Sequence, residues 1–210
     1  LGFTFPLAMI FQSVAMGLGI GASSVVARAM GSGQSEKAKK IITHSLVLMM
    51  ILIVLLIALI YWNTDTIFSF LGANEEASLL AVAYMDIWLL GLPFFTFAMV
   101  GSHLMRAIGD PATPAYLMMI GSVLQVLIAP ILIFGLLGAP KLGLEGAAWG
   151  FLLARLGSLL MYGYIIAIRD KLMIFSMQGF IASCRDILHV GLPAIASNSI
   201  APLSMALITK

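Results

Sequence analysis

Long apolar segments separated by short polar loops make up most of this chain. They cover about residues 3–27, 41–62, 78–106, 113–137 and 146–168, and a sixth begins near Ile187. At 1.5 Å rise per residue, each of the first five is long enough for a helix to cross a hydrocarbon core of about 30 Å. The pattern therefore predicts an all-α bundle of transmembrane helices, with about six spans in view.

Small residues mark one face of the first segment. Gly17 and Gly21 stand four residues apart, which places them on the same side of a helix. Membrane helices approach each other closely where such small residues meet. We therefore expect a neighbouring helix to contact this face.

Composition agrees with a membrane protein. Hydrophobic residues make up 61% of the chain and charged residues 10%, whereas soluble domains carry about 25% charged residues. So few charges cannot cover a water-facing surface. We expect a multi-pass protein of the cell membrane, most simply a bacterial inner membrane, with lipid and no nucleic acid as its surroundings.

The basic residues give the segments an orientation. Alternate loops hold all but one of the Lys and Arg residues outside the spans, and the other loops hold only Lys141. The basic set is Arg28, Lys37, Lys39, Lys40, Arg106, Arg169, Lys171 and Arg185. Positive charge favours the cytoplasmic side, so we place these loops in the cytoplasm.

Two of the cytoplasmic loops begin alike. One holds Arg28-Ala29-Met30-Gly31, and the other holds Arg106-Ala107-Ile108-Gly109-Asp110. We expect Gly31 and Gly109 to end their helices, since glycine terminates helices readily. The two arginines and Asp110 are interpreted as residues of loop packing and orientation.

Polar residues inside the spans are the candidates for a functional site. Asp86 and Arg155 are charged and far from the predicted helix ends, where an unpaired charge costs about 2.5 kcal/mol or more. We hypothesise that they pair, either as a proton or cation site or as a structural pair. Gln12 and Gln125 are further candidates for a substrate or ion pathway, with helix packing as the alternative.

Nothing in the sequence indicates catalysis or a metal site. His44, His103 and His189 are far apart, and Cys184 is the single cysteine. An integral-membrane enzyme needs a cluster of His, Asp or Glu near one interface, and the sequence shows none. We expect no catalytic residue, metal or cofactor.

The connection over 169–186 is longer than the other loops of the cytoplasmic side. Apolar residues alternate there with polar ones, at Ile174, Phe175, Met177, Phe180 and Ile181. This pattern predicts a short helix lying in the membrane interface.

Three motifs together resemble the multidrug and toxic compound extrusion (MATE) transporters. They are the loop from Gly21 to Gln34, the run Leu104-Met105-Arg106-Ala107-Ile108-Gly109-Asp110-Pro111, and Ile133-Phe134-Gly135 followed by 140–148. The resemblance implies twelve helices in two lobes. Residues 1–168 would then be helices two to six of the N-terminal lobe, 169–186 the link between lobes, and 187–210 the start of helix seven. The chain begins at Leu1, without methionine, as expected of a piece of a longer protein.

The resemblance also implies an activity. Family members export cationic amphipathic compounds in exchange for sodium ions or protons, so we expect an antiporter of cationic drugs, monomeric at full length. A flippase for lipid-linked precursors is the alternative, which a strongly basic central cavity would favour. Many members have an acidic residue just before the proline that corresponds to Pro130, with an asparagine one turn earlier. This chain has Ala129 and Gln125 there, so we expect the coupling carboxylate elsewhere.

Overall fold

The computed structural model describes residues 5–62, 75–138 and 140–208, without the side chains of a few residues near helix ends, Asp86 among them. These ranges form helices and contain no strand. The helices are α1 (Phe5–Gly31), α2 (Ser35–Trp62), α4 (Glu75–Ala107), α5 (Ala112–Phe134), α6 (Leu144–Tyr164) and α7 (Phe180–Ile208), with the 3-10 turn η1 (Leu136–Gly138) and the π-helical turn η2 (Ile165–Arg169). Five stretches are long and apolar enough to cross a membrane, and they lie in α1, α2, α4, α5 and α6 with η2. The predicted all-α transmembrane bundle is confirmed.

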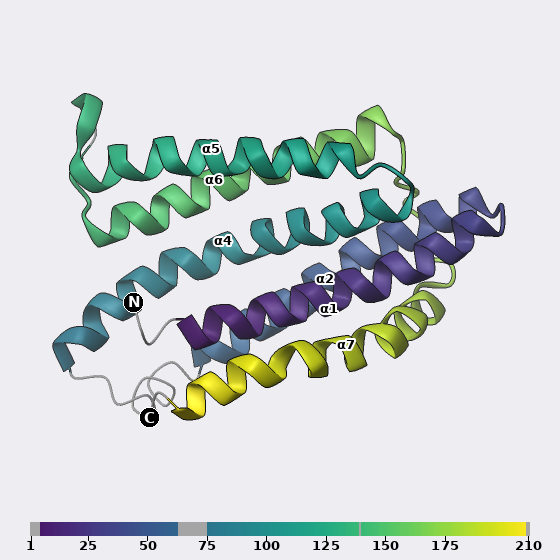
Figure 1. The fold of residues 1–210 in the computed structure, drawn as a ribbon, viewed down its shortest axis with the longest axis horizontal. Helices are drawn as coiled ribbons and strands as arrows, with labels where there is room; N and C mark the ends of the chain where they lie inside the picture. The colour runs from purple at the N-terminus through teal and green to yellow at the C-terminus, as the bar shows by residue number, and fades with distance from the viewer. Residues whose placement is uncertain (1–4, 63–74, 139, 209–210) are drawn as a thin grey trace.

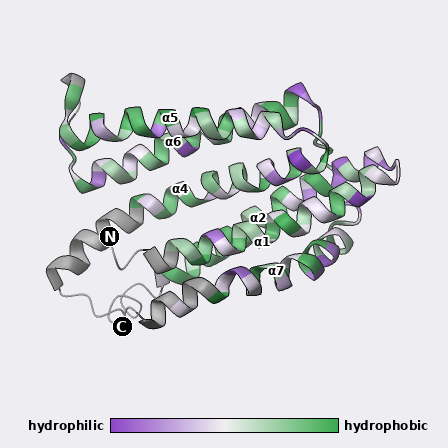
Figure 2. Ribbon diagram, viewed as in Figure 1, coloured by the Kyte–Doolittle hydropathy of each residue, from purple (hydrophilic) through white to green (hydrophobic). Residues whose placement is uncertain are grey.

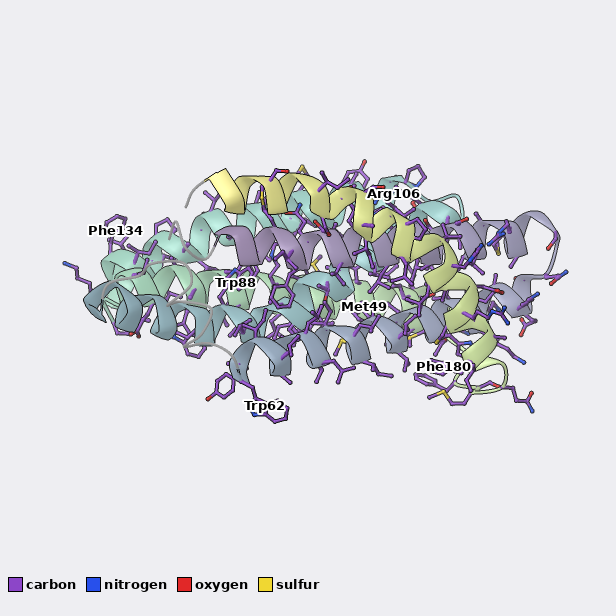
Figure 3. The ribbon with its side chains drawn as sticks, turned by 90° about the horizontal axis from the view of Figure 1, so that it is seen from below. Met49, Trp62, Trp88, Arg106, Phe134 and Phe180 are labelled. Carbon is purple, nitrogen blue, oxygen red and sulfur yellow. The ribbon has the colours of Figure 1, made fainter. Side chains whose placement is uncertain are left out.

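The helices form a flat bundle in which α4 occupies the middle (Figure 1). Helices α5 and α6 pair on one side of α4, and α1, α2 and α7 lie on the other. Apolar residues cover most of each helix, and the polar residues gather at one end of the bundle (Figure 2). Arg106 marks that end, whereas Phe134 and Trp62 lie toward the opposite one (Figure 3).

Glycines bring α1 and α7 into backbone contact, as the spacing of Gly17 and Gly21 predicted. A Cβ atom added to Gly21 would lie 2.4 Å from the carbonyl oxygen of Ile187, and one added to Gly17 would lie 2.7 Å from the Ile195 nitrogen. The Ser13 hydroxyl also donates a hydrogen bond to the Asn198 carbonyl, at 3.0 Å. The two helices are therefore joined along a face where no larger residue fits.

The two similar loops end their helices in the same way but with a different register. In α1 the amide of Gly33 donates to Met30 and that of Gln34 to Ala29. In α4 the amide of Gly109 donates to Arg106 and that of Asp110 to Met105. Both pairs form the Schellman motif, whose glycine takes a positive φ, +75° at Gly33 and +94° at Gly109.

Gly31 is the last residue of α1, as expected, and α4 ends at Ala107, two residues before Gly109. The left-handed residues are Gly33 and Gly109, because a Schellman motif needs positive φ two residues beyond the last helical residue. The matching Arg-Ala-x-Gly letters thus occupy different positions in the two helix ends.

The prediction of an interfacial helix in the connection over 169–186 is wrong. Residues 171–177 have no helix, and α7 begins at Phe180, before Ile187. Side chains of α2 bind the backbone of this link instead. The Ile174 amide donates to the Thr43 hydroxyl at 3.0 Å, and His44 Nε2 lies 2.7 Å from the Ser176 carbonyl oxygen.

His44 contacts both the C-terminal part of the link and the start of α7. It is 1% exposed, and its Nδ1 lies 2.9 Å from the Ser183 hydroxyl in the first turn of α7. A carbonyl can only accept, so Nε2 carries the proton that is donated to Ser176. The ring of Phe180 packs edge-on against His44, with centroids 5.4 Å apart. The start of α7 is thus fixed to α2 by one buried imidazole.

Replacing Gly21 with alanine tests the contact of α1 with α7. The added Cβ overlaps the Ile187 carbonyl, and overpacking of this kind costs about 1–3 kcal/mol. We expect Gly21→Ala to lower the melting temperature of the full-length protein in detergent by about 2–4 °C for each kcal/mol. Gly163→Ala is the matched control, because nothing lies within 4 Å of its added Cβ. Equal melting temperatures for the two variants would contradict the close contact.

His44→Ala tests the attachment of the link. It removes two hydrogen bonds, each contributing about 1 kcal/mol, so the link should open about 30-fold more often. We expect trypsin to cleave after Lys171 correspondingly faster in native protein. His189→Ala, on the exposed face of α7, should leave the rate unchanged. An unchanged rate in His44→Ala would show that the imidazole does not hold the link.

Candidate functional site

Helices α4 and α6 face each other with stripes of the same spacing. On α4 the stripe is Phe95, Met99, Ser102 and Arg106, and on α6 it is Phe151, Arg155, Ser158 and Tyr162. Steps of four, three and four residues keep each set on one side of its helix. The two stripes combine aromatic, hydroxyl and guanidinium groups within an otherwise apolar bundle.

A cavity of about 240 Å³ lies between these stripes. Helix α1 contributes Gln12 to its wall, and α5 contributes Leu117, Met118 and Gly121. The remaining wall comes from α4 and α6 and consists of Phe95, Ala98, Met99, Ser102, His103, Arg106, Arg155, Ser158 and Tyr162. Four helices therefore line one partly open cavity, in which several polar groups lie among apolar side chains.

Arg155 is the charged centre of this cavity. Its Nη2 donates a hydrogen bond to Gln125 Oε1 on α5, at 3.0 Å. Its guanidinium carbon lies 5.1 Å from the ring centre of Phe95 and 5.2 Å from that of Phe151. Such cation–π contacts contribute up to about 2 kcal/mol each where water is excluded. The arginine is thus held by α4, α5 and α6 together.

Buried polar atoms lie in this wall. Nε of Arg155 has no hydrogen-bond partner among the described residues. The hydroxyls of Ser102, 4% exposed, and Tyr162, 2% exposed, interact with each other. Leaving a buried polar group unpaired costs about 1–3 kcal/mol, so Arg155 Nε is a donor available to an occupant of the cavity.

The charge of the wall is positive. Arg155 and Arg106 contribute guanidinium groups and His103 an imidazole, and no Asp or Glu is among the residues that line the cavity in the described structure. Ala129, where many relatives were expected to have an acid, packs on α6 instead. Its Cα would lie 2.8 Å from a Cβ added to Gly150. The α5–α6 contact, rather than an ionisable group, occupies that position.

The structure brings three of the four candidate pathway residues together. Gln12 lines the cavity, Arg155 centres it and Gln125 binds Arg155. The side chain of Asp86 lies outside the described residues, so its pairing with Arg155 stays a prediction. Sequence reasoning missed Ser102 and Tyr162, although the repeated four-three-four spacing was the signal that could have found them.

The arginines of the two Arg-Ala-x-Gly loops line different cavities. Arg106 lines the cavity, whereas Arg28 lines a separate pocket of about 290 Å³ at the Arg106 end of the bundle, together with Lys37 and Asp186. Gly31 lies in open space, since nothing approaches its added Cβ within 4 Å. The two Arg-Ala-x-Gly loops therefore have different surroundings.

Asp110 caps helix α5. Its Oδ1 accepts the Thr113 amide at 3.0 Å and its Oδ2 accepts the Thr113 hydroxyl at 2.5 Å. Pro111 follows, which suits the first helical position because it needs no amide donor there. Arg169, at the end of η2, approaches the same carboxylate at 3.4 Å. The Asp110 loop is thus a helix cap that also ties α5 to the end of α6.

Taken together, the apolar helices and the cavity with polar groups between them are those of a multi-pass membrane protein of the transporter class. A family model described as MatE matches residues 1–131. The chain belongs to this family of multidrug and toxic compound extrusion transporters, as its motifs indicated, and it is a multi-pass protein of the cell membrane.

The relatives are transporters that are longer than this chain. It is 35% identical to a protein named FAD transporter from Shewanella oneidensis, over 99% of this chain and 47% of the relative. It is 27% identical to the probable multidrug resistance protein YoeA of Bacillus subtilis, over 75% of this chain and 34% of the relative. The chain thus spans less than half the length of these relatives.

Solved structures agree with this assignment. The bent form of the Vibrio cholerae MATE transporter VcmN superposes with a TM-score of 0.88 at 29% identity, covering 99% of this chain and 47% of that one. A transporter from Pyrococcus furiosus, described as having a binding pocket of reversed polarity, gives 0.84 at 33% identity, covering 98% and 45%.

Replacing Asp110 with alanine tests the cap. The hydrogen bonds from Thr113 hold the pKa of the Asp110 carboxyl below its usual value. The stabilisation is therefore complete above the pKa of the unfolded state, about 3.9, and is lost as pH falls through the lower folded pKa. We expect Asp110→Ala to cost about 0.5–2 kcal/mol at pH 7, with the difference in melting temperature shrinking in strong acid. A difference that stays constant from pH 7 to pH 2 would contradict this role.

Proposed function

We propose that the full-length protein is a secondary active exporter that moves amphipathic organic compounds across the membrane in exchange for sodium ions or protons. The observation that carries the proposal is the cavity with polar groups in its wall, lined by four apolar helices of a MATE-family bundle. A soluble cargo needs such a polar space to cross a membrane, and binding sites of repeat-built transporters lie inside the bundle. The proposal assigns transport and no enzymatic step.

The coupling ion binds outside this chain in our proposal. Sodium and proton coupling both need an ionisable or oxygen-rich site, commonly a carboxylate. The acidic side chains that the structure describes lie near helix ends, in Glu36, Asp110, Glu145, Asp170 and Asp186. This supports placing the coupling carboxylate in the rest of the protein, with Asp86, whose side chain lies outside the described residues, as the candidate within this chain.

Two classes of cargo are supported by different observations. Relatives named as multidrug resistance proteins, such as YoeA, support the cationic drugs that the sequence led us to expect. The basic wall of the cavity and the relative named FAD transporter support an organic anion as a second candidate. A basic cavity was also the feature expected of a lipid-linked precursor flippase, but the family match supports the exporter.

Transport into proteoliposomes tests the proposal. Full-length protein would be reconstituted, and a fluorescent cationic dye or FAD would be followed under a sodium gradient and, separately, a pH gradient. We expect one of the gradients to drive one of the two compounds against its concentration, which would also identify the ion and the cargo class. Protein-free liposomes provide the baseline. Folded protein that moves neither compound under either gradient would overturn the proposal.

A further inference from the structure

We propose that the cavity around Arg155 binds a phosphate group carried by the transported organic molecule. This inference deepens the proposed function. It rests on that function only in taking the bound molecule to be transported, because binding itself can be measured without a gradient. The chemical class of the ligand follows from the hydrogen-bonding groups and charges that line the cavity.

The wall holds two guanidinium groups, which can only donate hydrogen bonds. Arg155 Nε is buried and has no hydrogen-bond partner among the described residues, and a cationic or amine cargo would leave it unpaired. The hydroxyls of Ser102 and Tyr162 can donate or accept. An oxyanion brings acceptors, so it can bind Arg155 Nε and also accept from a hydroxyl of the wall.

The arrangement of charge favours phosphate. Arg155 and Arg106 both line the cavity, and arginine is suited to phosphate because its donors are fixed in one plane. Gln125 and the rings of Phe95 and Phe151 fix the guanidinium of Arg155. Its Nε is thereby held ready for an acceptor before the ligand arrives, which reduces the entropy lost on binding.

The size of the cavity limits what enters it. Pockets that bury a drug-sized ligand measure about 300–1,000 Å³, and this one measures about 240 Å³. It therefore holds one group of a larger molecule. Phe95, Met99, Leu117 and Met118 form the apolar part of its wall, against which an adjoining ring can stack or pack.

Riboflavin and flavin mononucleotide (FMN) are matched probes, since they share a ring and a side chain and differ by one phosphate. Binding to purified full-length protein would be followed by flavin fluorescence, without any gradient. We expect FMN to bind at least about tenfold more tightly than riboflavin, as a charge-assisted hydrogen bond requires. Inorganic phosphate should compete with FMN and leave riboflavin binding unchanged.

Substitutions in the cavity wall test whether the difference in affinity between FMN and riboflavin arises in this cavity. Arg155→Gln should remove most of the preference for FMN, while Arg185→Gln, on the exposed start of α7, should keep it. Tyr162→Phe and Ser102→Ala should each weaken FMN about threefold or more and leave riboflavin unchanged. The melting temperature of each variant, measured alongside, separates a loss of affinity from a loss of folding.

Equal affinities for FMN and riboflavin would overturn the inference, as would a preference that survives Arg155→Gln. Should Arg155→Gln fail to fold, the two hydroxyl variants decide, and FMN affinities unchanged in both would show that the cavity holds only water. A protein that binds FMN in this way but moves no flavin in liposomes would contradict the exporter and leave the phosphate site standing.

Discussion

A guanidinium inside an apolar helix bundle must be solvated by the protein itself, and Arg155 imposes this constraint on the structure. A charge at such depth costs about 2.5 kcal/mol or more unless neighbouring groups stabilise it. The chain meets the requirement with Gln125 from α5, Phe95 from α4 and Phe151 from α6. The positions of three helices are therefore tied to one side chain, and the cavity is the space that remains beside it.

The fold was largely predictable from the sequence, because membrane spans are set by length and hydrophobicity. The apolar runs located five helices, and the spacing of Gly17 and Gly21 identified the face on which α7 packs. The prediction for the link was wrong because its structure depends on distant partners. The apolar and polar residues over 171–177 resemble an interfacial helix, but Thr43 and His44 bind the backbone of this segment in a form without helix, and no local pattern encodes those contacts.

The site was predictable only in part. Mid-span polarity singled out Gln12, Gln125 and Arg155, because such residues are costly in lipid. It could not single out Ser102 or Tyr162, since serine and tyrosine are ordinary in membrane helices. Only their position opposite the polar stripe of the other helix indicates that they line a cavity. The shared letters around Arg28 and Arg106 did not reveal that the two helix ends differ in register. Helix ends are defined by the left-handed glycine, which is Gly33 in one loop and Gly109 in the other.

The central claim is that the cavity is positively charged and open to anions from water. Thiol labelling of Met99→Cys, in full-length protein whose other cysteines are replaced, measures this directly. An anionic sulfonate reagent and a cationic trimethylammonium reagent of the same thiosulfonate chemistry would be compared, with Gln178→Cys on the exposed link as reference. We predict that the anionic reagent is favoured at Met99 by about tenfold over the reference ratio, as two nearby guanidinium groups require. A ratio that favours the cationic reagent would contradict the account.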